Sequence, residues 1–154
     1  MRSSRVEAVI ISGFHTHLVT WFVGKMQQFR RGRHSVTDLE VHLVFVTNYR
    51  RKFLTPAALE RLSAVFKDTA RKMDFQVLEV NGEADHVHLL VEYSPKISIS
   101  KLVNHLKGVS SRTLRAEMKI ETPENHLWSP SYFASSCGGA SWDKIKDYIQ
   151  NQAN

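Results

Sequence analysis

Residues Phe75–Tyr93 have the sequence FQVLEVNGEADHVHLLVEY, in which two apolar runs flank a short polar segment. The runs, Phe75–Val80 and Asp85–Tyr93, are rich in the β-branched and aromatic residues that favour strands. The segment between them contains Asn81 and Gly82, and Asn-Gly is a strong signal for the tight turn of a hairpin. The sequence therefore predicts a β-hairpin with its turn around Asn81 and Gly82.

A helix is predicted on each side of this hairpin. Thr55 before Pro56 matches an N-cap followed by proline at the first helical position, and a helical apolar period predicts a helix over Pro56–Met73. Ser98 is the expected N-cap of a second helix, whose apolar stripe comprises Ile99, Leu102, Val103, Leu106, Val109 and Leu114. This stripe is expected to face the sheet. The basic residues of this helix expected to face solvent are Lys101, Lys107, Arg112 and Arg115.

Two further strands and a last helix complete the predicted order. Strands are predicted over Glu40–Thr47, before the first helix, and Tyr132–Ser136, after the second. Ser141 is the expected cap of a final helix, Trp142–Gln152. The first six elements match a ferredoxin-like split βαβ plan, an α+β fold in which two helices cover one face of an antiparallel sheet. The last helix is an addition to that plan.

Composition bounds the class of protein. A chain of 154 residues with 42% hydrophobic residues fits one folded domain. Lys and Arg outnumber Asp and Glu by 21 to 15, and the net charge of +6 favours a polyanionic partner such as nucleic acid or an anionic membrane surface. The single cysteine, Cys137, excludes an internal disulfide and a multi-cysteine zinc site, so a cytoplasmic setting is expected.

The first 25 residues differ from the rest. Their apolar patches fall short of the roughly 20 clean apolar residues that a membrane span needs, and they lack the small-residue cleavage site of a signal peptide. Two interpretations of residues 1–25 stay open: an N-terminal extension that is disordered or not native, or a real extra element. Residues 26–154 form the expected domain, and no membrane association is expected.

His86 and His88 form a His-x-His pattern near the start of the second hairpin strand. Because successive side chains of a strand point to opposite faces, both imidazoles project from one face, while Val87 and Leu89 project from the other. Two imidazoles at this separation can bind one metal ion. The spacing is also compatible with two polar residues that cap a half-buried strand through backbone hydrogen bonds, so it does not by itself establish a metal site.

Tyr148 and Gln152 lie four residues apart in the final predicted helix and therefore share one face of it. Tyrosine can act as a covalent nucleophile, and a glutamine amide supplies a neutral oxygen to a hard metal ion. An ordinary amphipathic helix whose tyrosine packs on the sheet explains the same spacing.

Basic and aromatic residues supply a candidate nucleic-acid surface. The candidate phosphate-binding residues are Arg30, Arg31, Arg33, Arg50, Arg51, Lys52, Lys107, Arg112 and Arg115. Such a surface follows phosphates in a salt-dependent way, although a solvated basic face explains any one of them. The aromatic residues that could stack on unpaired bases are Tyr49, Trp128, Tyr132 and Phe133, of which most are expected in the core.

A more specific signal comes from five segments in a fixed order: HLVFVTNYRRKF, DHVHLLV, KLVNHLKGVSSR, LWSPSYF and YIQNQ. Together they resemble the single-tyrosine HUH transposases of small insertion sequences, which are named for the His-hydrophobic-His pattern. The resemblance covers the sequence from Phe29 to Gln152. Transposase-like proteins associated with repetitive extragenic palindromes (REP) share this scaffold and are close relatives.

The resemblance implies a role for each candidate residue. His86 and His88 would be metal ligands, Gln152 the third protein ligand and Tyr148 the nucleophile. Asp85, just before the first histidine, could orient a ligand imidazole or could serve only to form a turn. The metal would be Mg2+ or Mn2+, because histidine ligands favour Mn2+ in affinity while abundance favours Mg2+.

The resemblance also implies a reaction and partners. Attack by Tyr148 would leave a 5′-phosphotyrosine link and a free 3′-OH, so cleavage and rejoining would need no external energy source. The substrate would be single-stranded DNA with hairpins at the ends of the element. The enzyme would be a homodimer in which the tyrosine helix of one subunit can complete the histidine site of the other. Two other classes stay open: a non-catalytic nucleic-acid-binding module, and a metal phosphohydrolase that does not require Tyr148.

Overall fold

The computed structural model describes residues 30–136 and 149–151. The chain divides into two units, residues 1–38 and 39–154. The predicted N-terminal extension, residues 1–25, lies outside the described residues. Among the helices that the structure describes, none is long and apolar enough to cross a membrane.

In the first unit, the described residues form a short antiparallel hairpin. Its strands are β1 (Arg30–Arg31) and β2 (Val36–Thr37). The amide of Gly32 donates a hydrogen bond of 2.7 Å to the carbonyl of Ser35 and closes the loop between the two strands. This hairpin carries the arginines predicted near residue 30.

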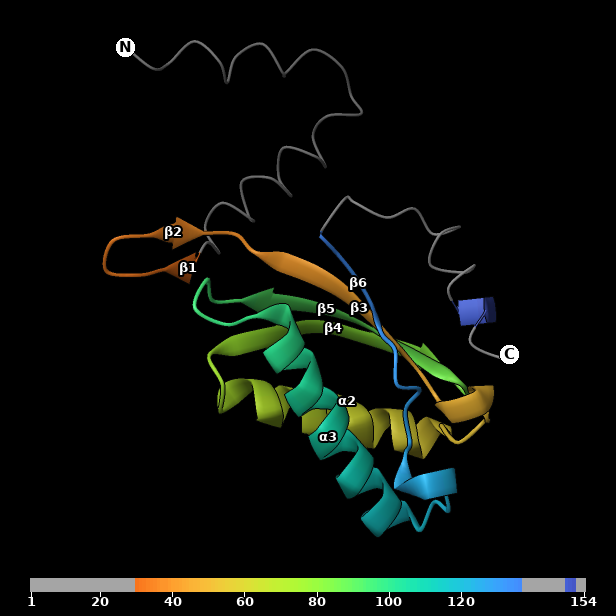
Figure 1. Cartoon of the computed structure of the whole chain (residues 1–154). Helices are drawn as coiled ribbons and strands as arrows, with labels where there is room; N and C mark the ends of the chain where they lie inside the picture. Colours follow the sequence, from red (N-terminus) through yellow and green to blue (C-terminus); the bar gives the residue numbers. More distant parts are fainter. Residues whose placement is uncertain (1–29, 137–148, 152–154) are drawn as a thin grey trace, which may run out of the picture. The chain divides into compact units, whose positions relative to one another are not determined.

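The second unit contains a four-stranded sheet in the order β4-β5-β3-β6, and every pair of neighbouring strands is antiparallel (Figure 1). The strands are β3 (Glu40–Val46), β4 (Phe75–Glu83), β5 (His86–Tyr93) and β6 (Phe133–Ser136). One helix connects β3 to β4, which are separated by β5, and another connects β5 to β6, which are separated by β3. This is the split βαβ arrangement, so the predicted ferredoxin-like α+β fold is confirmed.

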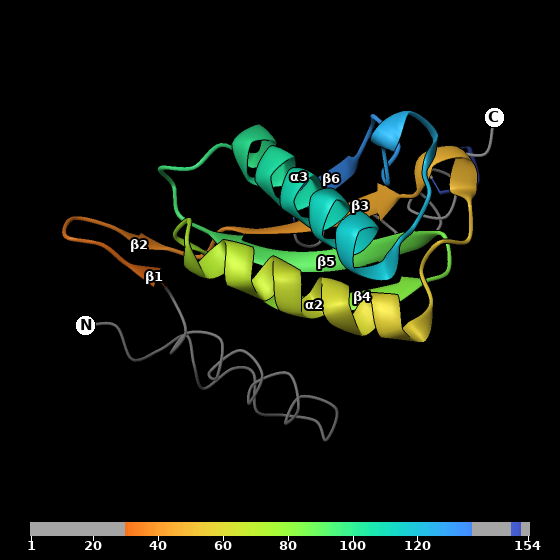
Figure 2. The ribbon, with the colours of Figure 1, turned by 90° about the horizontal axis from the view of Figure 1, so that it is seen from below.

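The two connecting helices, α2 (Pro56–Arg71) and α3 (Ile99–Met118), cover the same face of the sheet, as Figure 2 shows. Both begin where the sequence predicts. The side chains of Thr55 and Ser98 each accept a hydrogen bond from an amide in the first turn of their helix. These caps satisfy amide groups that have no partner within the helix.

Several element boundaries differ from prediction: β4 extends to Glu83, past the predicted Val80, while β5 begins at His86 and β6 at Phe133, each one residue late. Helix α2 ends at Arg71, before the predicted Met73, because the chain turns into β4 through Asp74, which has a left-handed φ of 58°. Strand β3 ends at Val46, since Thr47 forms only an isolated bridge to a residue outside the sheet. The central part of each element lies where the hydrophobic period predicts.

The turn of the hairpin is not at Asn81 and Gly82, as predicted, but at Ala84 and Asp85. Gly82 is a paired residue of β4. A Cβ atom on Gly82 would lie 2.8 Å from Cδ2 of Leu59 in α2 and 2.8 Å from a carbonyl oxygen of β5. Glycine is therefore required by close packing within the strand, and not by a turn.

The main core lies between the helices and the sheet. On β5 the residues alternate, so that Val87, Leu89 and Val91 are buried against the helices. The residues that pack with them include Val41, Leu43, Phe45, Leu62, Phe66, Leu102, Leu106 and Leu114. The same alternation places His86 and His88 on the opposite face of the sheet, as predicted.

Candidate active site

The candidate metal-binding histidines lie on the face of the sheet that α2 and α3 leave uncovered. His86 and His88 are half-buried. They lie opposite Val46 and Val44, respectively, on the neighbouring strand β3. The antiparallel register of the two central strands thus fixes both imidazoles on one face. The structure therefore brings the two predicted ligands together.

A third histidine, His42, lies on this face and was not among the predicted site residues. Its Nδ1 atom lies 3.0 Å from Nε2 of His88, and the two ring centroids are 5.1 Å apart. Burial and the nearby His42 lower the pKa of His88, which favours the neutral form that can bind a metal. Strand alternation puts His42 on the same face of β3 as Val44. This alternation was the signal in the sequence from which His42 could have been added to the candidate site.

Asp85 fixes the orientation of His86. It is buried in the turn before β5, and its Oδ1 atom lies 2.8 Å from Nδ1 of His86, while Oδ2 accepts a hydrogen bond of 3.1 Å from Nε of Arg50. Burial opposes ionisation of Asp85, but the hydrogen bonds from His86 and Arg50 outweigh it and lower the pKa of the carboxyl group. Asp85 therefore lies both in a turn and against the imidazole of His86, the two places considered for it.

The contacts of the two histidines leave one ring nitrogen of each for a metal. Since a carboxylate can only accept, Nδ1 of His86 donates to Asp85, which leaves the lone pair on Nε2. In the described part of the chain, no hydrogen bond engages Nε2 of His86 or Nδ1 of His88. Neutral imidazole nitrogens are ligands for divalent metals, so these side chains fit a divalent cation.

A second grouping of possible ligands overlaps this one. Glu83, Asp85 and His86 offer ligand atoms that all lie within 4.8 Å of one another. Asp85 is engaged with His86 and Arg50, whereas Glu83 is exposed. His86 belongs to both groupings.

The described end of the chain contacts the histidine face of the sheet. Residues 149–151 are helical, and the side chain of Ile149, which is 7% exposed, forms a small buried cluster with Val44 and Val46. These two valines pair across the sheet with His88 and His86. The predicted nucleophile Tyr148 and the predicted ligand Gln152 lie outside the described residues, as does most of the predicted last helix.

The predicted basic residues fall into distinct environments. Arg30, Arg31 and Arg33 belong to the first unit, and Arg51, Lys52 and Arg112 are exposed in the second. Arg50 is paired with Asp85, and Arg115 is half-buried. Only part of the predicted basic surface is therefore solvated.

The expectation that Lys107 faces solvent is wrong. Its Nζ atom donates hydrogen bonds to the carbonyl oxygens of Ser129, Pro130 and Ser131, at 2.6, 3.4 and 3.1 Å. Burial lowers the pKa of Lys107 to about 8. The side chain ties α3 to the segment that leads into β6, and it reaches that segment because its long stem spans the gap from the helix.

Among the four predicted stacking aromatics, only Tyr49 is well exposed. Trp128 is buried, and its indole nitrogen donates to Oγ of Ser110, while Tyr132 and Phe133 pack against the core clusters. The prediction that most of them lie in the core is therefore confirmed. Tyr49 is 63% exposed and has a left-handed φ of 55°.

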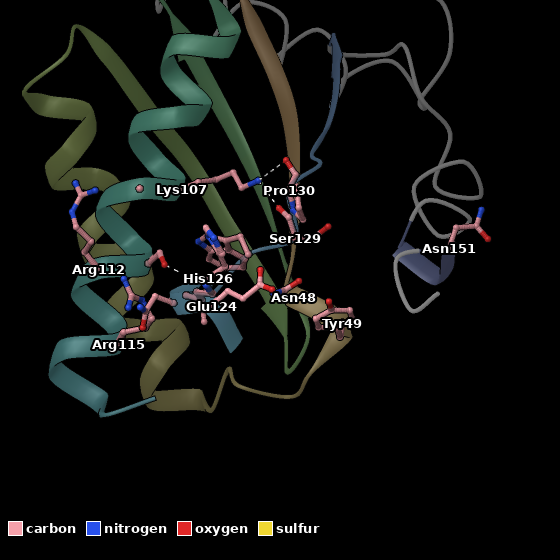
Figure 3. Close-up of a pocket in the computed structure, with 15 residues that line it drawn as sticks. Asn48, Tyr49, Lys107, Arg112, Arg115, Glu124, His126, Ser129, Pro130 and Asn151 are labelled. Carbon is pink, nitrogen blue, oxygen red and sulfur yellow. Dashed lines mark hydrogen bonds between the residues drawn. The ribbon is translucent and has the colours of Figure 1, made fainter. Parts of the chain in front are cut away.

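A separate pocket of about 620 Å³ is lined by none of His42, Asp85, His86 and His88. One side is the basic edge of α3, and the other includes Tyr49 and Asn48 of the short helix η2 (Asn48–Arg50), with η3 (Pro123–Asn125) and the residues after it between them (Figure 3). The lining residues are Asn48, Tyr49, Lys107, Gly108, Ser111, Arg112, Arg115, Glu124, Asn125, His126, Leu127, Trp128, Ser129, Pro130 and Asn151. We name this hollow the α3 pocket.

Comparison with known proteins identifies the family. The chain is 30% identical over 128 residues to the ISDra2 transposase TnpA of Deinococcus radiodurans, covering 81% of this chain and 91% of that protein. It is 29% identical over 122 residues to the transposase for insertion sequence element IS200 of Salmonella typhimurium, covering 77% of this chain and 80% of the relative.

Solved structures agree with these relatives. A crystal structure of a Deinococcus radiodurans protein assigned as a transposase has a TM-score of 0.71 and 31% identity, covering 80% of this chain and 97% of that one. A REP-associated tyrosine transposase bound to a REP hairpin has a TM-score of 0.51 and 11% identity, covering 78% and 67%, and is similar in fold. Residues 35–152 match the family model described as "Transposase IS200 like". The protein therefore belongs to the family of IS200-like transposases.

Proposed function

We propose that the protein cleaves and rejoins single-stranded DNA at the ends of an insertion sequence through a 5′-phosphotyrosine intermediate on Tyr148. The observation that carries this proposal is the pair His86 and His88, held on the uncovered face of the sheet with Asp85 against His86 and with Ile149 packed on the neighbouring strand. Because Tyr148 precedes Ile149 in the sequence, the contact of Ile149 supports a nucleophile near the histidines.

In this proposal His86, His88 and Gln152 hold Mg2+ or Mn2+. A bound divalent cation would polarise the phosphodiester and offset the negative charge that the attacking oxygen meets. The neutral form of His88, favoured by its burial, and the tautomer of His86, fixed by Asp85, both support binding of a cation.

Tyr148 would attack the phosphorus with its phenolic oxygen. The bond from phosphorus to Oη forms as the bond from phosphorus to the 3′-oxygen breaks, and the phenolic proton is transferred in net terms to the departing 3′-oxygen. Reversal of the same step by another 3′-OH rejoins the strand. A free tyrosine has a pKa of about 10, so a cationic environment is needed to favour the phenolate.

The proposed substrate is single-stranded DNA with hairpins at the ends of the element. A protein of the same fold was solved bound to a REP hairpin, which supports a hairpin partner and keeps a REP-associated nuclease as the second candidate function. The exposed Arg51, Lys52 and Arg112 would contact phosphates. We further propose that the protein acts in the cytoplasm as a homodimer with active sites shared between subunits.

The proposal is tested by incubating a labelled single-stranded end hairpin, taken from the DNA that flanks the gene, with the full chain and Mn2+ or Mg2+. A denaturing gel should show a covalent protein–DNA adduct. Tyr148→Phe should abolish it, whereas Tyr93→Phe, at the far end of β5, should retain it. Adducts that persist in Tyr148→Phe would overturn the assignment of the nucleophile.

Two other outcomes separate the remaining classes. Cleavage that releases phosphate-ended products independently of Tyr148 would indicate a phosphohydrolase. Tight binding of the hairpin with no cleavage, unchanged in His86→Ala and His88→Ala, would indicate a non-catalytic binding module. Hairpin-forming sequences at both sides of the gene would favour an intact element over a REP-associated relative.

A further inference from the structure

The α3 pocket has an electropositive wall that includes two arginines without a polar partner among the described residues. Arg112 and Arg115 line it, and in the part of the chain that the structure describes neither guanidinium forms a hydrogen bond or an ion pair. The buried Nε atom of Arg115 has no hydrogen-bond partner. A buried donor without a partner is costly, so an acceptor that reaches the Arg115 guanidinium would be favoured.

Gly108 gives this wall its shape. It lies in the middle of α3, where glycine costs about 1 kcal/mol relative to alanine. A Cβ atom on Gly108 would lie 3.3 Å from Nη1 of Arg112, so the guanidinium rests against the helix where the side chain is missing. Among the residues that line the pocket, three side chains are cationic, Lys107, Arg112 and Arg115, and one, Glu124, is a carboxylate. The wall suits an anion.

The opposite rim carries an aromatic ring. Tyr49 is 63% exposed, and the guanidinium carbon of Arg51 lies 5.9 Å from the centroid of its ring. An exposed ring with a cation over it is a platform for a nucleobase, since base stacking on aromatic and arginine planes is how proteins hold unpaired bases. The exposed His126 lies between this rim and α3 (Figure 3). It and the exposed Asn125, which also lines the pocket, offer polar groups to a base edge.

Strained backbone surrounds the pocket. Three of its lining residues have left-handed φ values although none is glycine: Tyr49 at 55°, Glu124 at 53° and Asn125 at 60°. For Tyr49 and Glu124, unlike asparagine, such a conformation costs on the order of 1–3 kcal/mol and persists where the surrounding structure enforces it, commonly at ligand sites. Here the Thr47 hydroxyl lies 2.6 Å from the carbonyl oxygen of Arg51 and 3.1 Å from that of Asp85, and its single proton holds the first turn by donating to the nearer or sharing between the two.

The same contacts connect the pocket to the candidate metal centre. The amide of Thr47 donates to the carbonyl of Asp85 at 2.9 Å, and the next amide, that of Asn48, donates to Leu127 at 2.9 Å. Asp85 in turn contacts His86. Asn48 and Leu127 line the pocket, and Thr47, next to Asn48 in the chain, contacts the turn that precedes the two histidines.

We propose that the α3 pocket binds one unpaired nucleotide of the DNA strand beside the cleaved phosphodiester, with the base on the Tyr49 ring and a phosphate on Arg112 and Arg115. This inference rests on the proposed function for the identity of the strand. The volume of about 620 Å³ falls within the range of roughly 300–1,000 Å³ typical of small-ligand sites.

The test measures coupling between the base and the Tyr49 ring. Fluorescence anisotropy compares the Kd of the full chain for fluorescein-labelled (dT)12 with its Kd for the same strand in which every base is replaced by an abasic tetrahydrofuran unit. Tyr49→Asn removes the ring while keeping a residue that tolerates positive φ. The ratio of the Kd for the abasic strand to the Kd for (dT)12 measures what the bases contribute to binding. Tyr49→Asn should reduce this ratio by roughly 5- to 150-fold, the range expected for one stacked base. Tyr49→Phe should retain the ratio.

Matched controls isolate the pocket. Leu78→Asn replaces another exposed apolar side chain, on β4, and should leave the Kd ratio unchanged. Arg112→Gln and Arg115→Gln should each lower the slope of log Kd against log salt by about 0.7, the value for one phosphate of a single strand. Arg71→Gln, an exposed arginine on α2, should not change this slope.

An unchanged Kd ratio in Tyr49→Asn overturns the proposal, even if the arginine variants lower the salt slope, because the pocket would then be only part of a phosphate track. Adduct formation by the wild-type chain is scored separately. If adducts form without base coupling, the pocket assignment fails alone. If coupling is present without any adduct, the proposed reaction fails and the nucleotide site stands.

Discussion

The Nδ1 atom of His42 lies 3.0 Å from Nε2 of His88, although the two residues are 46 positions apart in the sequence. The contact follows from the antiparallel pairing of β3 with β5, which puts His42 diagonally across from His88 on the same face. A metal-binding imidazole is commonly oriented by a partner on its other nitrogen. His42 is therefore placed to orient His88 in the way that Asp85 orients His86.

We expect His42→Phe to weaken Mn2+ binding by roughly 10-fold or more, because loss of such an orienting contact typically costs 10- to 100-fold in metal affinity. Phenylalanine keeps the ring volume and removes the hydrogen bond. Titration of Mn2+ followed by electron paramagnetic resonance measures the change. His105→Phe, on the exposed side of α3, is the matched control. Equal affinities in both variants would show that His42 only packs against His88.

Asp85→Asn should lower the free energy of unfolding, because the carboxylate of Asp85 binds both His86 and Arg50. The amide retains one acceptor oxygen, so either His86 or Arg50 loses its partner, at a cost of about 1.5–3 kcal/mol for a hydrogen bond to a charged group. Urea unfolding at pH 7 measures the loss. Asp68→Asn, which removes only exposed ion pairs on α2, should change stability little. A similar loss in both variants would contradict a special role for Asp85.

The order of the elements followed from the sequence because strand and helix periods differ, and because Thr55 and Ser98 mark both helix starts. The hairpin turn was predicted three residues too early. Asn-Gly satisfies the local rule for a turn, but Gly82 is used for close approach to Leu59, a residue distant in sequence. Tertiary packing decides between the two uses, and a local pattern carries no information on it.

The site shows the same division. His86 and His88 share a face through strand geometry alone, which is local and therefore predictable. The contact of His42 with His88 depends on which strands pair and in what register. Lys107 follows the helical pattern of a solvated residue, and only the path of residues 129–131 across α3 makes it a buried tether. These contacts are non-local.

Lys107→Met should destabilise the fold, because the carbonyl of the buried Ser129 loses the Lys107 donor and an unsatisfied buried polar group costs about 1–3 kcal/mol, whereas the carbonyls of the exposed Pro130 and Ser131 can bind water. Lys101→Met, on the exposed side of the same helix, is the control. Burial lowers the pKa of Lys107 to about 8. Since the unfolded chain then binds more protons above that pH, the contribution of Lys107 to stability should rise between pH 8 and the ordinary lysine pKa of about 10.4. Urea unfolding at pH 7.5 and 9.5 tests this, and parallel curves for wild type and Lys107→Met would contradict it.

Ile149→Ala should impair catalysis more than folding. Ile149 anchors residues 149–151 on Val44 and Val46, outside the main core, so its loss should cost near the lower end of the range of about 2–5 kcal/mol for such truncations. The adduct-forming rate should fall by roughly 100-fold, because a displacement of about 1 Å at a reacting group has an effect of that order. Ile99→Ala truncates a residue that packs on the opposite, helix-covered core, and it should lower stability while retaining the adduct rate of the remaining folded protein. Single-turnover adduct formation and urea unfolding, measured on both variants, separate the two effects. If both variants lose activity only in proportion to the unfolded fraction, then the packing of Ile149 on the histidine face has no part in positioning the nucleophile.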